Sequence, residues 1–201
     1  ENVKFADEWV TTAPGTDGAL AMAMGHVVLK EYFVDREIDF FTHYNQRFTD
    51  APFLVSLDEV DGADGRGVFT PGKFLVAGDV EGHPQGGSEN AMWKPMVLDA
   101  ATGEAVAPRG SVGFRYGEEG MGQWNLDLGE IEPKLSLYAA GSPSADTPAA
   151  VTVRLPRFDT PGGKLTTTDR GVPVVKVGDR LVTTVLDLML AHYGVERAGL
   201  P

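Results

Sequence analysis

The turn Pro14-Gly15-Thr16-Asp17 is the stretch of this sequence whose residue types are best suited to face a ligand. A glycine lets the backbone approach a bound group closely, and the helix expected to follow offers unpaired N–H groups with partial positive charge. The carboxylate of Asp17 could accept two N–H donors from the edge of a guanine ring. The competing interpretation is a plain helix cap, in which Thr16 accepts a backbone N–H and Asp17 only favours the helix dipole. Taken alone, so short a motif favours the cap.

The other residues that could do chemistry form no recognisable site. Cysteine is absent, which excludes a disulfide, a thiolate nucleophile and a thiolate metal ligand. The four histidines lack metal-ligand spacing, and we expect His26 to be a hydrogen-bonded packing residue. The acidic stretch 58–64 lacks the oxygen spacing and terminal glutamate of a calcium loop. Neither a nucleophile elbow nor a phosphate-binding P-loop motif is present. These residues therefore predict one ligand-facing turn and no complete active site.

The length and charge of the chain limit the kinds of function that it can have. The chain has 201 residues, which fits one domain or slightly more. Its 17 basic and 29 acidic residues give a net charge of −12, which argues against nucleic acid as a partner and against adsorption to anionic lipid. No apolar run reaches the ~18 residues of a membrane span. Because Glu1 is not a start methionine and no signal segment opens the chain, we expect an internal piece of a longer protein or a processed product.

The spacing of apolar residues predicts three helices, near residues 17–32, 37–47 and 184–193. The second has a single expected apolar stripe, formed by Ile38, Phe41, Tyr44 and Phe48. At the third, Thr184 and Asp187 have capping-box spacing, and Gly194 suits a left-handed C-terminal cap.

Between the second and third helices, glycine and proline break the chain into short strands. Two hairpins are expected, one pairing 53–57 with 68–76 and one pairing 95–99 with 104–107. Further strands are expected at 111–116, 134–138, 150–155 and 172–177, and loops at 81–90 and 141–149. The predicted fold class is mixed α and β, with an inserted section rich in β-hairpins rather than a regular βα alternation.

Four segments, in order along the chain, resemble a known family. They are residues 14–26, 44–57, 106–118 with 124–126, and 181–197. The first, PGTDGALAMAMGH, resembles the molybdopterin oxidoreductases of the dimethyl sulfoxide reductase family. The later three are not generic to that family, and they narrow the resemblance to the catalytic alpha subunits of respiratory nitrate reductases. Together the segments cover nearly the whole chain.

The resemblance implies a parent enzyme that carries a bis(molybdopterin guanine dinucleotide) molybdenum cofactor and a 4Fe-4S cluster. Such an enzyme reduces nitrate to nitrite by oxygen-atom transfer in anaerobic respiration. Its electrons come from quinol through an iron–sulfur beta subunit and a haem-containing membrane gamma subunit. The parent is therefore expected on the cytoplasmic side of the cell membrane, attached through these partners.

For this chain, the resemblance implies that Gly15, Thr16 and Asp17 face the guanine end of one pterin nucleotide. It therefore favours the interpretation of the turn as ligand-facing over its interpretation as a plain helix cap. The family's cluster cysteines and molybdenum-binding aspartate lie upstream of this turn, and nothing before Pro14 matches them. We therefore expect no catalytic or metal-binding residue here, no bound cofactor, and no catalysis by the chain alone. Gly18 stands where the family more often has alanine.

The resemblance also predicts a division of the chain. Residues 1–50 would be a strand–turn–helix piece of the α/β guanine-nucleotide-binding domain, 51–178 a β-rich insertion, and 179–201 the returning helix of that domain. The loops at 61–90 and 141–173 diverge from the family pattern and receive no role. Three alternatives remain open: a sister molybdoenzyme acting on selenate, chlorate or a hydrocarbon; a free-standing binding module; and an interaction domain whose hairpins at 68–138 dock an electron-transfer subunit.

Overall fold

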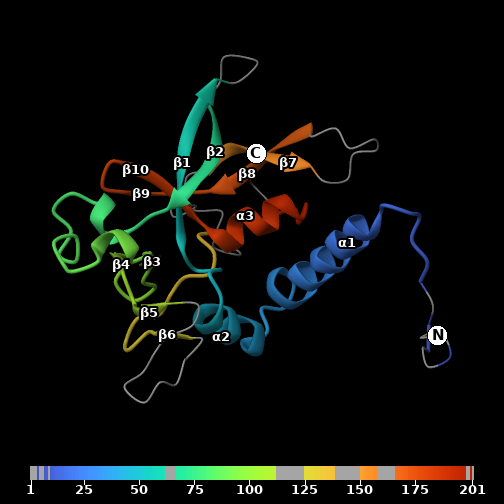
Figure 1. The fold of residues 1–201 in the computed structure, drawn as a ribbon, viewed down its shortest axis with the longest axis horizontal. Coiled ribbons are helices and arrows are strands. Elements are labelled where there is room, and N and C mark those ends of the chain that lie inside the picture. The colour runs from blue at the N-terminus through green and yellow to red at the C-terminus, as the bar shows by residue number, and fades with distance from the viewer. Residues whose placement is uncertain are drawn as a thin grey trace.

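The computed structural model describes residues 4, 7–8, 10–61, 67–111, 125–138, 150–157, 166–197 and 200. Helices and a curled mixed sheet are both present, so the predicted mixed α and β class is confirmed (Figure 1). The helices are α1 (Asp17–Leu29), the π-helical turn η2 (Lys30–Val34), α2 (Asp39–Phe48), the 3₁₀ turns η3 (Ala77–Asp79) and η4 (Ala91–Trp93), and α3 (Val185–His192). The strands are β1 (Leu54–Asp61), β2 (Gly67–Phe74), β3 (Val97–Leu98), β4 (Ala105–Val106), β5 (Arg109–Ser111), β6 (Asn125–Asp127), β7 (Ala150–Arg157), β8 (Thr166–Pro173), β9 (Val175–Val177) and β10 (Arg180–Thr184).

A six-stranded sheet with the order β8-β7-β2-β1-β10-β9 forms the centre of the molecule. Every neighbouring pair is antiparallel except β2 and β7, which pair in parallel through Phe69 and Val153. Helix α3 lies on one face, where Leu188 and Ala191 pack against apolar residues of β1, β7 and β8. A separate apolar cluster joins β1 and β10 to the segment 75–107, which carries the small hairpin β3–β4. Helix α3 therefore packs on one face of the sheet, and the segment 75–107 packs against β1 and β10.

Both predicted hairpins are confirmed. β1 and β2 pair in antiparallel register from Asp61 with Gly67 onward, and Val97 and Leu98 pair with Val106 and Ala105. The second hairpin turns at Gly103, whose φ of +75° is a left-handed conformation that glycine adopts without strain. Residues 81–90 form turns and bends, as expected of a loop.

Some strand predictions need correction. Residues 134–138 are not a strand, because their polar groups turn to α3 instead: the Leu137 N–H donates to the Asp187 carboxylate. The stretch 172–177 is divided at Val174 between the end of β8 and β9. Strand β10 is an additional strand that was not predicted, and its last residue, Thr184, was expected to begin the last helix. The predicted strand at 111–116 and the loop at 141–149 lie outside the described residues apart from Ser111.

The predicted helices exist, with shifted ends. The first ends its α-helical part at Leu29 and continues as the π-helical turn η2. In the second, the expected single stripe is wrong. Phe41 packs inward against Phe33, while the rings of Phe40, Tyr44 and Phe48 contact one another in a row that stays exposed. The larger side chains of this helix therefore divide between two faces.

The third helix has the caps that the sequence predicts. Thr184 Oγ1 accepts a hydrogen bond from the Asp187 N–H at 3.1 Å. At the other end, Gly194 has a φ of +69°, and the N–H of Val195 donates to the Leu190 carbonyl at 2.9 Å. This is the Schellman arrangement, with Val195 and Leu190 also in the same apolar cluster.

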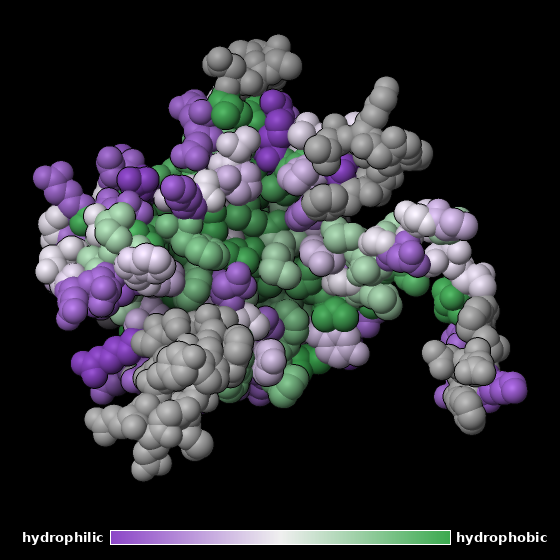
Figure 2. Space-filling view, in the orientation of Figure 1, coloured by the Kyte–Doolittle hydropathy of each residue, from purple (hydrophilic) through white to green (hydrophobic). Residues whose placement is uncertain are grey.

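Helix α1 stands away from the body of the molecule, and Leu29 is its one buried residue (Figure 1). The side chains of Met24, Val27 and Val28 are about half exposed, and Figure 2 shows apolar surface along this helix. Its contact with the body is at the end of α3. Gly25 faces the Tyr193 ring, and His26 Nδ1 donates to the Tyr193 carbonyl at 2.8 Å, which confirms His26 as a hydrogen-bonded packing residue.

This contact predicts opposite effects for two glycine substitutions in α1. A Cβ at Gly25 would overlap the Tyr193 ring, so Gly25→Ala must displace the ring, and we expect it to lower the free energy of unfolding by about 1–2 kcal/mol. A Cβ at Gly18 would meet nothing within 4 Å, so Gly18→Ala should raise it by up to about 1 kcal/mol through helix propensity. Urea denaturation of both variants checks this, and equal effects would contradict the Gly25 contact.

Candidate functional site

The predicted ligand-facing turn is present at the start of α1. Gly15 has a φ of +81°, and the Ala13 carbonyl accepts hydrogen bonds from the N–H of Thr16 at 3.1 Å and from its hydroxyl at 2.7 Å. The expectation that the Thr16 side chain caps the helix is wrong, because this hydroxyl is already used to close the turn. The start of α1 consequently has no side-chain cap. The N–H groups of Ala19 and Leu20 donate to the Thr16 carbonyl, which leaves those of Asp17 and Gly18 without a partner among the described residues.

Asp17 is the first residue of α1, and its side chain is exposed. One carboxylate oxygen, Oδ1, accepts a hydrogen bond from Thr12 Oγ1 at 2.9 Å, which holds the carboxylate in place. Positions for a Cβ at Gly15 and Gly18 have no atom within 4 Å, so the backbone beside Asp17 is open to approach from outside. The three residues Gly15, Thr16 and Asp17 thus present an oriented carboxylate beside uncapped N–H groups.

A guanine ring offers two adjacent N–H donor groups, and a carboxylate with two oxygens can accept both. Within the described residues, Oδ2 of Asp17 has no hydrogen bond, and Oδ1 has accepting capacity beyond the Thr12 hydroxyl. The residues of this turn therefore fit the guanine end of a nucleotide. They carry no group suited to nucleophilic or acid–base catalysis in a buried site.

A cavity of about 370 Å³ runs along the same helix, between α1 and the end of the sheet. Ala19, two residues after Asp17, lines it, and Arg157 and Arg170 line its other side. His26 and His192 complete its polar lining with Thr168, and no acidic side chain is among the lining residues. In a chain with a net charge of −12, this is a locally basic hollow next to the turn.

Comparison with known proteins identifies the family. The chain is 52% identical over 202 aligned residues, and over its whole length, to the nitrate reductase alpha subunit of Mycobacterium tuberculosis (strain H37Rv). It is 38% identical over 216 aligned residues, with 98% of the chain covered, to the respiratory nitrate reductase 2 alpha chain of Escherichia coli K12. This chain belongs with the nitrate reductase alpha subunits.

The chain spans about 16% of the length of these two relatives, so it corresponds to a segment of such a subunit. The perchlorate reductase subunit alpha of Dechloromonas aromatica is also similar, at 31% identity over 64% of the chain and 13% of its own length. No protein-family model matches the chain. Nitrate reductase alpha subunits are oxidoreductases, which confirms the predicted enzyme class of the parent.

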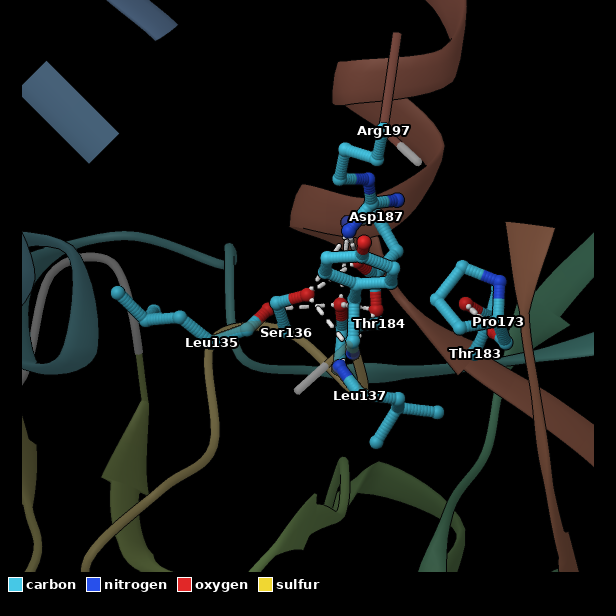
Figure 3. Close-up of polar contacts among 9 residues, drawn as sticks. Leu135, Ser136, Leu137, Pro173, Thr183, Thr184, Asp187 and Arg197 are labelled. Carbon is cyan, nitrogen blue, oxygen red and sulfur yellow. Dashed lines mark hydrogen bonds and ion pairs between the residues drawn. The ribbon is translucent and has the colours of Figure 1, made fainter. Parts of the chain in front are cut away.

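Sequence reasoning did not foresee the polar cluster around Asp187, whose side chain is fully buried (Figure 3). Its Oδ1 accepts from Ser136 Oγ at 2.5 Å and from Arg197 Nη1 at 2.6 Å. Its Oδ2 accepts from the Leu137 N–H at 2.8 Å and lies 3.0 Å from Thr184 Oγ1, which also donates to the Leu135 carbonyl at 2.7 Å. The cluster joins the start of α3, the chain after α3 and the segment 135–137.

The local signal for this cluster was the Thr184–Asp187 spacing, and it indicated only the helix cap. Ser136 lies 51 residues from Asp187 along the chain, and Arg197 lies 10 residues away beyond the end of α3. No single helix or strand contains either pair, because α3 ends at His192 and Ser136 belongs to a distant segment. The pairing therefore had to come from the fold.

Among the described residues, the carboxyl groups of Asp99 and Asp169 have shifted pKa values. The Glu132 N–H and the Thr102 hydroxyl donate to Asp99 and hold its pKa below the ordinary range. The Arg154 guanidinium, with two hydrogen bonds of 2.9 Å, lowers the pKa of Asp169. Among the described residues, no group of three or more His, Asp or Glu side chains is placed to hold a metal ion. The same part of the chain has no helix long and apolar enough to cross a membrane.

We expect Asp187→Asn to lower the free energy of unfolding by about 3–5 kcal/mol, because it leaves the buried Arg197 without its charged partner. The matched control is Asp169→Asn, which breaks the partly exposed pair with Arg154 and should cost about 1 kcal/mol or less. Urea denaturation at neutral pH measures both. Similar losses for the two variants would contradict the dominant role given to the buried pair.

The lowered pKa of Asp99 predicts a loss of stability in acid. A carboxyl whose pKa is lower in the folded than in the unfolded state stabilises the fold above the unfolded value of about 4, and this contribution is lost as pH falls through the folded value. Unfolding free energies measured between pH 5 and pH 3 should therefore fall less steeply for Asp99→Asn than for the unmodified chain. Identical slopes would show that the Glu132 and Thr102 hydrogen bonds do not favour the ionised carboxylate.

Proposed function

We propose that this chain forms one wall of the pocket for a molybdopterin guanine dinucleotide in a molybdenum-dependent nitrate reductase. The observation that carries the proposal is the open turn at Gly15–Asp17, where an oriented carboxylate lies beside uncapped helix N–H groups. The similarity to nitrate reductase alpha subunits over the whole chain supplies the context in which this turn has a nucleotide to bind.

In this proposal each residue of the turn has a distinct task. The left-handed conformation of Gly15 allows the backbone to bend without a side chain between the turn and the purine. Thr16 closes the turn through the Ala13 carbonyl and so sets the direction in which α1 begins. Asp17 accepts the N1–H and exocyclic N–H of guanine, while the Thr12 hydroxyl keeps its carboxylate oriented.

The basic hollow beside α1 supports the same assignment. The dinucleotide is anionic through its phosphates, and Arg157 and Arg170 place positive charge within reach of a ligand that extends from the turn along the helix. The exposed apolar residues of α1 are consistent with a helix that other parts of the parent cover.

The parent enzyme would reduce nitrate to nitrite in anaerobic respiration with electrons from quinol. An iron–sulfur beta subunit and a haem-containing membrane gamma subunit would deliver them, and the parent would lie at the cytoplasmic side of the membrane through these partners. The bound bis(molybdopterin guanine dinucleotide) molybdenum cofactor would supply the oxygen-atom transfer chemistry, and a 4Fe-4S cluster the last electron step. This chain contributes binding and orientation.

A sister enzyme is the second candidate, and the likeness to a perchlorate reductase subunit is the observation that favours it. That likeness covers 64% of the chain at 31% identity, whereas the likenesses to the two nitrate reductase alpha subunits named above cover 98% and 100% of it, at 38% and 52% identity. Nitrate is therefore the substrate we propose. Steady-state rates of the purified parent with nitrate, chlorate, perchlorate and selenate distinguish the two candidates.

The turn is tested by Asp17→Ala in the full parent enzyme. Loss of two hydrogen bonds from a charged acceptor should lower the fraction of enzyme loaded with nucleotide cofactor by about tenfold or more. The loaded fraction is measured as guanine nucleotide released on acid hydrolysis per mole of protein, together with the molybdenum content. The control is Asp39→Ala, which removes the equivalent first-turn aspartate of α2.

Unchanged guanine nucleotide and molybdenum in the Asp17→Ala enzyme would refute the role of the turn. Equal losses in the Asp39→Ala enzyme would also count against it, since they would indicate a general defect in folding.

A further inference from the structure

Helix α2 carries a row of exposed aromatic side chains. Phe40, Tyr44 and Phe48 follow one another at intervals of four residues, and they are 76%, 49% and 45% exposed. Their ring centroids lie 5.8 Å and 5.2 Å apart, so the rings contact one another along the helix. The helix itself lies at the edge of the molecule, next to β6 (Figure 1). We call these three side chains the aromatic row.

The exposure of the row does not come from a loosely attached helix, because other residues of α2 hold it to the body. Phe41 packs against the apolar cluster that contains Leu29 and Leu190. Gln46 Nε2 donates to the Pro133 carbonyl at 2.7 Å. The aromatic row therefore lies on a helix with a fixed position, and the described part of the chain leaves it uncovered.

A hollow of about 490 Å³ lies beside the row, and no acidic side chain is among the residues that line it. Arg47 lines it, is exposed, and forms no ion pair with any described residue. Leu128, just after β6, adds a further apolar side chain. The surface thus combines apolar rings with a guanidinium that still lacks a charged partner. An occupant that complements it is apolar on one side and carries a carboxylate for Arg47.

The size of the row indicates how its occupant is attached. With these exposed fractions, the three side chains present roughly 350 Å² of surface. A stable interface between separate chains buries about 800 Å² on each partner, so the row alone is too small to hold a free partner. A segment of the same polypeptide needs less area, because its effective concentration is high. This chain spans about 16% of the length of its relatives, so most of the parent subunit lies outside it.

The spacing of the rings indicates the shape of the occupant. Side chains at intervals of four residues form a ridge along a helix. Such a ridge fits between the corresponding ridges of a second helix, which then crosses the first at about −50°. A strand has a side-chain period of two residues and offers no grooves of matching spacing. A helix is therefore the element that the aromatic row fits.

We propose that the aromatic row is the docking surface for an amphipathic helix from another part of the same alpha subunit, outside this chain. The apolar face of that helix packs across Phe40, Tyr44 and Phe48, and a carboxylate at the edge of the face pairs with Arg47. The proposal rests on the membership of the chain in the nitrate reductase alpha subunits and is independent of the nucleotide turn. The competing occupants are another subunit, a second copy of the alpha subunit and lipid.

Photo-cross-linking in the assembled parent enzyme identifies the occupant. A benzophenone amino acid replaces Tyr44, at the centre of the row, and mass spectrometry identifies the peptide that becomes attached. We expect one dominant peptide, from the alpha subunit outside this chain, whose apolar residues recur at intervals of three and four. The control is the same probe at Asp179, in the exposed turn between β9 and β10, which should not yield that peptide.

Every other result of the cross-linking would overturn the proposal. Attachment to a different subunit, to a second alpha subunit, to lipid or to residues of this chain identifies another occupant. Absence of any cross-link from the Tyr44 position shows that the row faces solvent. A helical peptide without a carboxylate would also contradict the complementarity given to Arg47.

Charge reversal tests the pairing with Arg47. Arg47→Glu in the parent enzyme places like charges opposite each other, so the thermal midpoint should fall. Changing the carboxylate of the identified helix to lysine should restore at least half of that loss in the double variant. The control is Lys176→Glu, at an exposed lysine with no ion pair among the described residues, and the same lysine substitution should not rescue it. No rescue for Arg47, or equal rescue for Lys176, would refute the pairing.

Discussion

The buried carboxylate of Asp187 is the constraint on which the arrangement of this chain depends. Its oxygens accept from Ser136, Leu137 and Arg197, which come from the segment before β7 and from the chain after α3. Removing two charges from water carries a large cost, and only several well-aligned hydrogen bonds can offset it. Few alternative packings would satisfy this carboxylate, so the cluster restricts where α3 and the segment 135–137 can lie.

The sheet shows why such a restriction is needed. β2 and β7 are parallel neighbours, so the chain between them has to cross from one end of the sheet to the other. Among the residues that the structure describes between β2 and β7, no α-helix makes this crossing. The small hairpins β3–β4 and β5–β6 and the extended segment 131–138 lie along it instead. Hydrogen bonds to Thr184 and Asp187 fix this irregular path at residues 135–137.

Local features of the fold were predictable, and long-range pairings were not. The Thr184 cap, the Gly194 C-terminal cap and the two hairpins each depend on residues a few positions apart, so they can be recognised from the local sequence. The pairing of β10 with β1 joins residues about 130 positions apart, by the register of Leu54 with Thr184. Segment 134–138 has the composition of a strand, but Leu135, Ser136 and Leu137 bond to the side chains of Thr184 and Asp187 instead of a neighbouring strand. The site departs from this rule: the turn at Gly15 was foreseen, but the Thr16 hydroxyl donates to the Ala13 carbonyl three residues away instead of capping α1.

The thin attachment of α1 has a consequence for assembly. With one buried residue, this helix gains little from its own packing, and isolated helices of 13 residues are marginal in water. Most of the free energy that keeps it in position must then come from neighbours supplied by the rest of the parent and by whatever occupies the turn. Under the proposed function, binding of the cofactor and stabilisation of α1 in its position are thermodynamically linked. During maturation, the site beside α1 would therefore stay accessible until the cofactor binds.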